Sequence, residues 1–440
     1  MAVRNPPRGF LASLRHLGPG LILSAAIVGS GELIATTALG AKAGYVLLWV
    51  IPLSCLMKVT LQVEYGRQCI LRGQSAFGIW NTGNGLRFRG LHWSVCAALL
   101  FMATVWLGMA GVIGAASQVL VHAFPGSRVE WWVGATALLL ALLVFHGKYG
   151  PIEKIATFLN CVFVAAIIYC NVATQSTPYA YSLDTVTAGF RFRLPHEGIG
   201  LAVAVFGITG VASGEIIMYV LWCLEKGYAA WTGPYDGSAE WVARARGWIR
   251  VMKTDALLSL AVYTLTTCGF YLLGAAVLHA QGTIADGNEL IFQLSGILTN
   301  VLGPGSVAIF MVCAFSVLFG TMFSNVAGQA RMWADMLPIL GLCEATAEGR
   351  RKVVRVLSWV QPALWAVTYV SFQRPLGLVV FMGVMNAVFL LVVAWQGVVF
   401  RYERPEPSLN PSRGYDAALW LSIASIVAVA AMTLHSLVGG

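Results

Sequence analysis

The chain has 440 residues, of which 58% are hydrophobic and only 11% charged, and its formal net charge is +9. An average soluble domain carries about 25% charged residues, so this composition excludes a soluble globular protein and indicates a polytopic membrane protein. The basic residues stand in short loops between apolar segments without interleaved aromatics, which argues against nucleic acid as a partner. Nine cysteines stand singly without CxxC spacing, as apolar filling residues do, and predict neither disulfides nor a zinc site.

Apolar segments of about 17 to 25 residues recur along the chain, and each can cross a hydrocarbon core of about 30 Å. We count about eleven. In chain order they cover residues 18–40, 45–69, 93–121, 131–146, a fifth ending near 172, then 198–222, 256–279, 307–336, 356–371, 376–399 and 417–437. The sequence therefore predicts an all-α membrane protein in which the lipid bilayer is the main partner.

The distribution of basic residues predicts the orientation. Arg4, Arg8 and Arg15 precede the first span, and further clusters lie at residues 244–253 and 350–355. The positive-inside rule places these segments on the cytoplasmic side. With an odd number of spans, the N-terminus is then cytoplasmic and the C-terminus outside, and we expect a bacterial inner (plasma) membrane.

The first span contains the run Gly29, Ser30, Gly31 and Glu32 in the middle of an apolar segment. Glycine costs about 1 kcal/mol relative to alanine in a helix interior, and an ionised carboxylate is costly at membrane depth. Helix-breaking residues next to a buried carboxylate are typical of a binding site in a transporter.

The run recurs in the sixth span. VGSGELI covers residues 28–34 and VASGEII covers residues 211–217, so Glu32 has its counterpart in Glu215. Five spans separate the two runs, and an odd offset inverts the second unit, as in transporters built from inverted repeats with broken first helices. We expect one transmembrane domain over residues 1–440, with repeats at about 17–173 and 196–399 and an extra helix at about 417–437.

Several segments together resemble the natural resistance-associated macrophage protein (NRAMP) family of proton-coupled divalent metal transporters. They are GPGLILSAAIVGSGE, GYVLLWVIPLSCLMKVTLQ with Gln62 at the family's glutamine, GVIGAA, KYGPIEK, NVAGQARM and RRKVVRVLSWVQPA, in the family's order. The resemblance implies a LeuT-type 5+5 inverted repeat with helices 1 and 6 broken. It also implies a monomer.

The family's functional positions hold other residue types here. Its metal-binding aspartate, proline and asparagine fall on Gly29, Ser30 and Glu32, and its methionine, proline and histidine fall on Ala212, Ser213 and Gly214. The acidic pair of span 3 falls on Gly108 and Gly111. The resemblance therefore implies a divergent branch that keeps the scaffold and changes the site.

We interpret the altered site as an all-oxygen set in which Glu32 and Glu215 are the metal ligands. The surrounding substrate-binding positions would be Gly29, Ser30, Gly31, Ala212, Ser213, Gly214, Gln62 and Asn386. Asn325 and Gln329 could also face the site, although buried amides equally serve as hydrogen-bond contacts between helices. Oxygen ligands favour hard cations, so we expect a divalent cation such as Mg²⁺ or Mn²⁺ as substrate, with no cofactor. Proton coupling is left open because the acidic pair is missing.

Lys58 stands about midway through the second span, where a cation is costly. It either forms an ion pair with Glu64 or a site glutamate, or it is a fixed cation that replaces a bound ion and contributes to coupling. A fixed cation that faced the site would repel a metal.

The position of Lys58 keeps a second hypothesis open, namely a LeuT-fold carrier of an amino acid or another small organic substrate. In this hypothesis the carboxylate of the substrate would bind the backbone N–H groups of residues 29–31. We do not expect an enzyme, because no HExxH, GxSxG or phosphate-loop motif is present.

Overall fold

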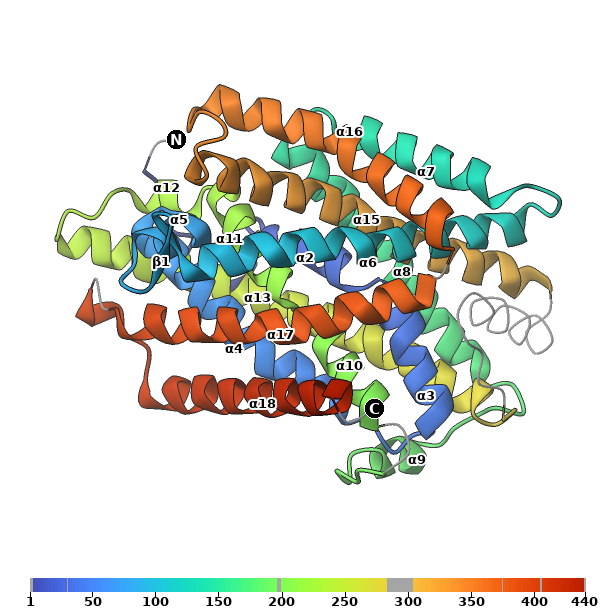
Figure 1. Ribbon diagram of the computed structural model, residues 1–440. Coiled ribbons are helices and arrows are strands. Elements are labelled where there is room, and N and C mark those ends of the chain that lie inside the picture. The colour runs from blue at the N-terminus through green and yellow to red at the C-terminus, as the bar shows by residue number, and fades with distance from the viewer. Residues whose placement is uncertain are drawn as a thin grey trace.

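The chain is almost entirely helical in the computed structural model, which describes residues 3–29, 31–195, 199–282, 304–373, 375–403 and 406–438 (Figure 1). The unbroken long helices are α4 (Val50–Arg72), α6 (Trp93–Ala123), α7 (Val129–Val144), α8 (Tyr149–Thr174), α13 (Ala239–Leu273), α15 (Pro304–Ile339), α16 (Ala347–Phe372), α17 (Pro375–Tyr402) and α18 (Arg413–Val438). Within these ranges, the strands β1 (Arg87–Phe88) and β2 (Leu91–His92) form a short antiparallel hairpin.

Two helices are interrupted. The first runs as α2 (Pro19–Ile27), then as the π-helical η1 (Gly31–Thr36) and α3 (Thr37–Ala43), and the second runs as α10 (Ile199–Ile208) and α11 (Ser213–Lys226). The axis of the first turns by 50° at the interruption. Both predicted breaks are therefore present in the fold.

Eight helices in the described part of the chain are long and apolar enough to cross a membrane, and the bent pair of α2 with η1 and α3 adds a ninth. The all-α polytopic fold is as predicted. The count of about eleven spans stays a prediction, because α7 has only 16 residues and α4 carries Lys58, Glu64 and Arg67 within its length.

Helices of the first half and of the second half pack in matching pairs. The half-helix α2 packs against α8, and its counterpart α10 packs against α17. Likewise α6 packs against α17, and its counterpart α15 packs against α8. In the same way α4 packs against α11, and its counterpart α13 packs against η1 and α3. This pairing is the one that a 5+5 inverted repeat produces, with α18 added outside it against α17 and α4.

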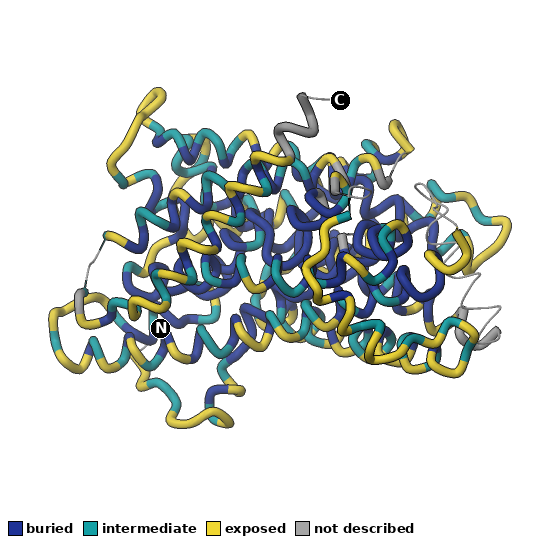
Figure 2. The backbone as a smooth tube through the Cα atoms, turned by 90° about the horizontal axis from the view of Figure 1, so that it is seen from below, coloured by how far each residue is buried: buried dark blue, intermediate teal, exposed yellow. Residues whose placement is uncertain are grey.

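Buried residues gather in the middle of the molecule, and exposed residues lie mostly on its outer helices and loops (Figure 2). Many of the exposed side chains on the outer helices are large and apolar, for example Leu142 on α7, Phe158 on α8, Leu265 on α13 and Val367 on α16. Such a surface is suited to lipid rather than to water.

The short elements distinguish the two ends of the helix bundle. α5 (Ala76–Thr82), α12 (Tyr228–Thr232) and the hairpin lie at one end, and α3 and α9 (Leu183–Ala188) lie at the other (Figure 1). We call these the α12 end and the α3 end. The small elements α1 (Phe10–Leu14), η2 (Gly274–Leu278) and η3 (Pro407–Leu409) complete the described structure.

Candidate functional site

The interruption of the first helix is held by side chains from two elements. The hydroxyl of Thr321 on α15 donates to the carbonyl of Val28 at 3.1 Å, so one carbonyl freed at the end of α2 is paired. The carboxylate of Glu32 accepts from the backbone N–H of Gly29 at 3.0 Å. A side chain at Gly29 would overlap Thr321, so only glycine fits this contact. Gly29 thus allows close packing and is not among the residues that line the cavity described below.

Glu32 is completely buried and only half satisfied. Its Oε2 is used by Gly29, whereas its Oε1 has no hydrogen-bond partner among the described residues. A buried carboxylate oxygen without a partner is costly, and it is a position where a proton or a cation can bind. Of the other predicted positions in this run, Gly31 begins η1, and Ser30 lies outside the described residues.

The interruption of the second helix consists of Thr209, Gly210 and Val211, with Ala212 as the N-cap of α11. Gly210 has φ of 68°, in the left-handed region that favours glycine, and a Cβ there would lie 3.0 Å from Cα of Cys55. The chain can therefore reverse against α4 and start a new helix. Glu215 sits in the first turn of that helix, where the helix dipole stabilises a carboxylate.

The carbonyls at the end of α10 are paired by α4. The ammonium of Lys58 donates to the carbonyls of Phe206 and Gly207 and, at 2.8 Å, to that of Thr209. Ser54, one turn earlier, donates to the carbonyl of Phe206 at 3.0 Å. A cation at the negative end of a half-helix is favourable, so Lys58 acts as a C-terminal cap.

The predicted ion pair of Lys58 with Glu64 is wrong. Glu64 is paired with Arg67 at 2.5 Å on the same helix, and among the described residues Lys58 has no carboxylate within ion-pair distance. The physical reason is that the free carbonyls of α10 lie closer to its ammonium than any carboxylate does. Lys58, Glu32 and Glu215 are still near enough to interact electrostatically.

The start of the first helix has a matching cap, which sequence reasoning missed. Asp255 on α13 is buried and accepts from the backbone N–H groups of Gly18 at 2.8 Å and Gly20 at 2.6 Å. Tyr219 donates to the same carboxylate at 3.0 Å. α4 and α13 occupy corresponding places in the two halves, and each supplies a buried charge to one end of a half-helix. Asp255 stands at the boundary between the basic and the apolar half of α13, so the sequence marks it no more clearly than the neighbouring charged residues.

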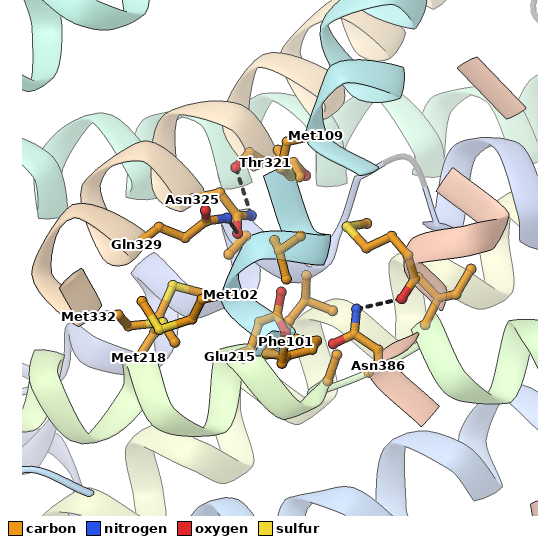
Figure 3. Close-up of a pocket in the computed structure, with 18 residues that line it drawn as sticks. Phe101, Met102, Met109, Glu215, Met218, Thr321, Asn325, Gln329, Met332 and Asn386 are labelled. Carbon is orange, nitrogen blue, oxygen red and sulfur yellow. Dashed lines mark hydrogen bonds between the residues drawn. The ribbon is translucent and has the colours of Figure 1, made fainter. Parts of the chain in front are cut away.

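A partly enclosed cavity of about 40 Å³ lies between the two interruptions, with room for a cation and a few water molecules (Figure 3). Four predicted positions line it, namely Ala212, Gly214, Glu215 and Asn386. Glu215 is half-buried and borders the cavity, whereas Glu32, Lys58 and Gln62 are fully buried and are not part of its lining. Both amide atoms of Gln62 lack partners among the described residues.

Ser213 stands behind this lining rather than in it. Its hydroxyl donates to the Asn386 side chain at 2.9 Å, and that amide donates to the carbonyl of Met382 at 3.0 Å. The serine therefore orients the Asn386 amide, which borders the cavity.

A polar strip on α15 forms another part of the wall. Thr321, Asn325 and Gln329 all face the cavity, and their amides are linked, since Asn325 donates to the carbonyl of Thr321 at 3.0 Å and Gln329 donates to Asn325 at 3.2 Å. Spacing of four residues puts them on one helix face. This periodicity of polar residues inside an apolar span is visible in the sequence.

Methionines make up much of the remaining wall, which the sequence analysis did not anticipate. Five of the 13 methionines in the chain are among the 18 residues that line the cavity: Met102, Met109, Met218, Met332 and Met382. The expected all-oxygen set of ligands stays a prediction, but the cavity wall also offers sulfur. The family's methionine position holds Ala212, and thioethers from α6, α11, α15 and α17 border the cavity instead.

Carboxylate, amide and thioether groups are therefore the donors that this cavity offers. Over the described residues, no three side chains of the types His, Cys, Asp and Glu come together as a metal cluster. A metal held here would use one or two carboxylates, neutral oxygens and sulfur.

The fold and the paired interruptions define a membrane transporter of the LeuT type. Residues 20–436 match the family described as natural resistance-associated macrophage protein-like, so the chain belongs to this family. Members of the family are transporters and not enzymes.

Relatives of known name share part of the sequence. The divalent metal cation transporter MntH of Deinococcus radiodurans is 25% identical over 334 residues, covering 74% of this chain and 71% of the relative. MntH of Xylella fastidiosa is 28% identical over 329 residues, covering 72% of this chain and 64% of the relative. The aligned part thus leaves about a third of each relative unmatched.

Solved structures share the fold. A manganese transporter of Eremococcus coleocola, in complex with an aromatic bis-isothiourea compound, has a TM-score of 0.72 at 16% identity and covers 99% of this chain and 90% of its own. MhsT in complex with L-phenylalanine has a TM-score of 0.60 at 12% identity and covers 97% of this chain and 99% of its own.

Proposed function

We propose that this protein is a secondary transporter that carries a divalent metal cation, of the hardness of Mn²⁺, through the cavity between its two broken helices. The observation that carries the proposal is the pair Glu32 and Glu215, one at each interruption, with Glu215 on the cavity wall and an unpartnered oxygen on Glu32. Family membership and the names of the relatives support it.

The charges of the site attract a cation. Two ionised carboxylates outweigh the single ammonium of Lys58, and that ammonium is bound to the carbonyls of α10 rather than to a carboxylate. The net charge of −1 that these three groups leave attracts a cation to Glu215 in a region of low dielectric. Lys58 remains our candidate for the fixed charge that a coupling ion would otherwise supply.

The donor set favours Mn²⁺ over Mg²⁺. Mg²⁺ demands oxygen ligands in nearly ideal octahedral geometry, and thioethers bind it poorly. Asn386 and Gln329 line the same cavity as Glu215 and carry amide oxygens, and the methionines add sulfur that a transition metal accepts better than Mg²⁺ does. Of the two cations expected from the sequence, the structure thus supports Mn²⁺ better.

An organic substrate is less well supported. Binding of a substrate carboxylate to the first interruption needs free backbone N–H groups, but the N–H of Gly29 is already used by Glu32. The cavity of about 40 Å³ also offers space for a hydrated ion rather than for a side chain as large as that of phenylalanine.

We further propose that the chain works as a single-domain monomer in a bacterial plasma membrane, with the α12 end in the cytoplasm. The basic residues at 244–253 and 350–355, in the first turns of α13 and α16, support this orientation. The division into repeats at about 17–173 and 196–399, with a last helix at about 417–437, follows from the same proposal.

Uptake into proteoliposomes tests the function. We expect Mn²⁺ uptake well above that of protein-free vesicles, little Mg²⁺ or Ca²⁺ uptake, and no competition by phenylalanine. Uptake of phenylalanine without uptake of any divalent metal would overturn the proposal.

A further inference from the structure

The cavity methionines are not spread evenly around Glu215. Met102 on α6, Met218 on α11 and Met332 on α15 lie together on one side of it and point toward one another (Figure 3). We call these three side chains the methionine trio. Each is at most 3% exposed. Met109 and Met382 also line the cavity, and Met109 stands apart from the trio (Figure 3).

The backbone makes room for one of these thioethers. A Cβ at position 328 would overlap Sδ of Met218, so Gly328 on α15 lets the sulfur lie against that helix, one turn before Met332. Methionine often fills irregular space in a core, but aliphatic side chains fill such space equally well. At the overall methionine content of this chain, less than one methionine would be expected among 18 lining residues, and there are five.

We infer that the methionine trio is a soft-donor site that binds a thiophilic monovalent cation of the Cu⁺ class, next to Glu215 in the cavity that holds the divalent cargo. Thioethers are neutral, polarisable ligands that select Cu⁺ over hard cations. Glu215 stands beside the trio and supplies a negative charge that offsets the single positive charge (Figure 3).

The site has a functional consequence that rests on the proposed function. α11 and α15 run from the cavity toward the α12 end, so the trio occupies the part of the cavity between Glu215 and that end (Figure 1). A soft cation bound there lies in the way of a divalent cation that leaves toward the α12 end. Soft cations are therefore expected to inhibit transport of Mn²⁺ without competing for the Glu32 position.

Binding is tested with Ag⁺, a stable probe for Cu⁺, on protein labelled with ¹³C in the methionine methyl groups. Thiols also bind Ag⁺, so Cys96, Cys161, Cys268 and Cys343, the cysteines that are not buried, are first replaced by serine. Methyl resonances report thioether binding directly, whatever the remaining thiols do. We expect Ag⁺ to shift three methionine methyl signals strongly and that of Met311, a buried methionine elsewhere on α15, not at all.

Substitutions assign the signals and measure the contribution of each thioether. Met102→Leu, Met218→Leu and Met332→Leu conserve volume and so leave the fold intact. Each should weaken Ag⁺ binding at least tenfold, whereas Met311→Leu should leave it unchanged. Shifts confined to other methionines, or equal Ag⁺ affinity in the three variants and in Met311→Leu, would overturn the inference.

The transport arm separates this inference from the proposed function. In proteoliposomes, Ag⁺ should inhibit Mn²⁺ uptake by the cysteine-substituted protein, and the same Ag⁺ concentration should inhibit each of the three Met→Leu variants less, measured relative to that variant's own uptake without Ag⁺. If the protein does not transport Mn²⁺ at all, the proposed function fails, and the methyl signals still decide whether the trio binds Ag⁺.

Discussion

The carboxylate of Glu32 accepts a hydrogen bond from the backbone N–H of Gly29 at 3.0 Å, across the interruption of the first helix. Glu32 therefore carries a carboxylate of the site and also fixes the position of the interruption in the first helix. Its second oxygen has no partner among the described residues. One side chain can thus fix the backbone with one oxygen and bind a cation or a proton with the other.

Neutralising either glutamate should abolish most transport. Glu32→Gln and Glu215→Gln keep the shape of the side chain but remove a charged ligand, which costs about tenfold or more in binding. We expect Mn²⁺ uptake into proteoliposomes to fall by at least about that factor. Glu344→Gln, at an exposed position, is the matched control and should transport normally. Normal uptake by both site variants would show that the carboxylates are not ligands.

Loss of the Lys58 ammonium should destabilise the protein. Lys58→Met keeps most of the side-chain length but leaves the carbonyls of Phe206, Gly207 and Thr209 without this donor. An unsatisfied buried polar group costs about 1–3 kcal/mol, so thermal unfolding in detergent should occur at a clearly lower temperature. Lys42→Met, at an exposed position on α3, should not change it. Equal unfolding temperatures for the two variants would contradict the assignment of Lys58 as a cap.

A side chain at position 29 should force the first helix away from α15. In Gly29→Ala the new methyl overlaps Thr321, and because overpacking costs about 1–3 kcal/mol, we expect lower thermal stability. Adding Thr321→Ala removes the nearest atoms and should restore part of the loss. Gly134→Ala on α7, where a Cβ meets open space, should be neutral or slightly stabilising. A tolerated Gly29→Ala would argue against this close contact.

Loss of the Asp255 carboxylate should destabilise the protein about as much as loss of the Lys58 ammonium, although Asp255 does not line the cavity. Asp255→Ala removes the acceptor for the N–H groups of Gly18 and Gly20, and such a cap contributes about 0.5–2 kcal/mol. We expect faster hydrogen exchange at the start of α2 and a lower unfolding temperature. The exposed Asp184→Ala is the control. Unchanged exchange at residues 18–20 would show that the carboxylate does not hold this helix end.

The fold could be predicted from the sequence because its strongest signals are local. Long apolar segments and two copies of a Ser-Gly-Glu run indicate the spans, the two interruptions and the inverted repeat. Of the site, Ala212, Gly214 and Glu215 line the cavity and follow from the repeat, and Asn325, Gln329 and Asn386 line it as polar residues inside apolar spans. Their roles in binding stay predictions.

The rest depends on contacts between distant segments. The partner of Lys58 is a helix end that exists only after α10 and α4 pack together, so charge pairing along the sequence indicated the wrong residue. The methionines come from separate helices, and each one alone is indistinguishable from a core residue. The loss of the motif methionine therefore gave no indication that other methionines line the cavity.

The central claim is tested most directly by crystallography with Mn²⁺, using the anomalous scattering of the metal. We predict one anomalous peak inside the cavity within coordination distance of a Glu215 oxygen, and loss of that peak in the Glu32→Gln, Glu215→Gln double variant. No peak in the cavity of the unaltered protein, or the same peak in the double variant, would contradict the account.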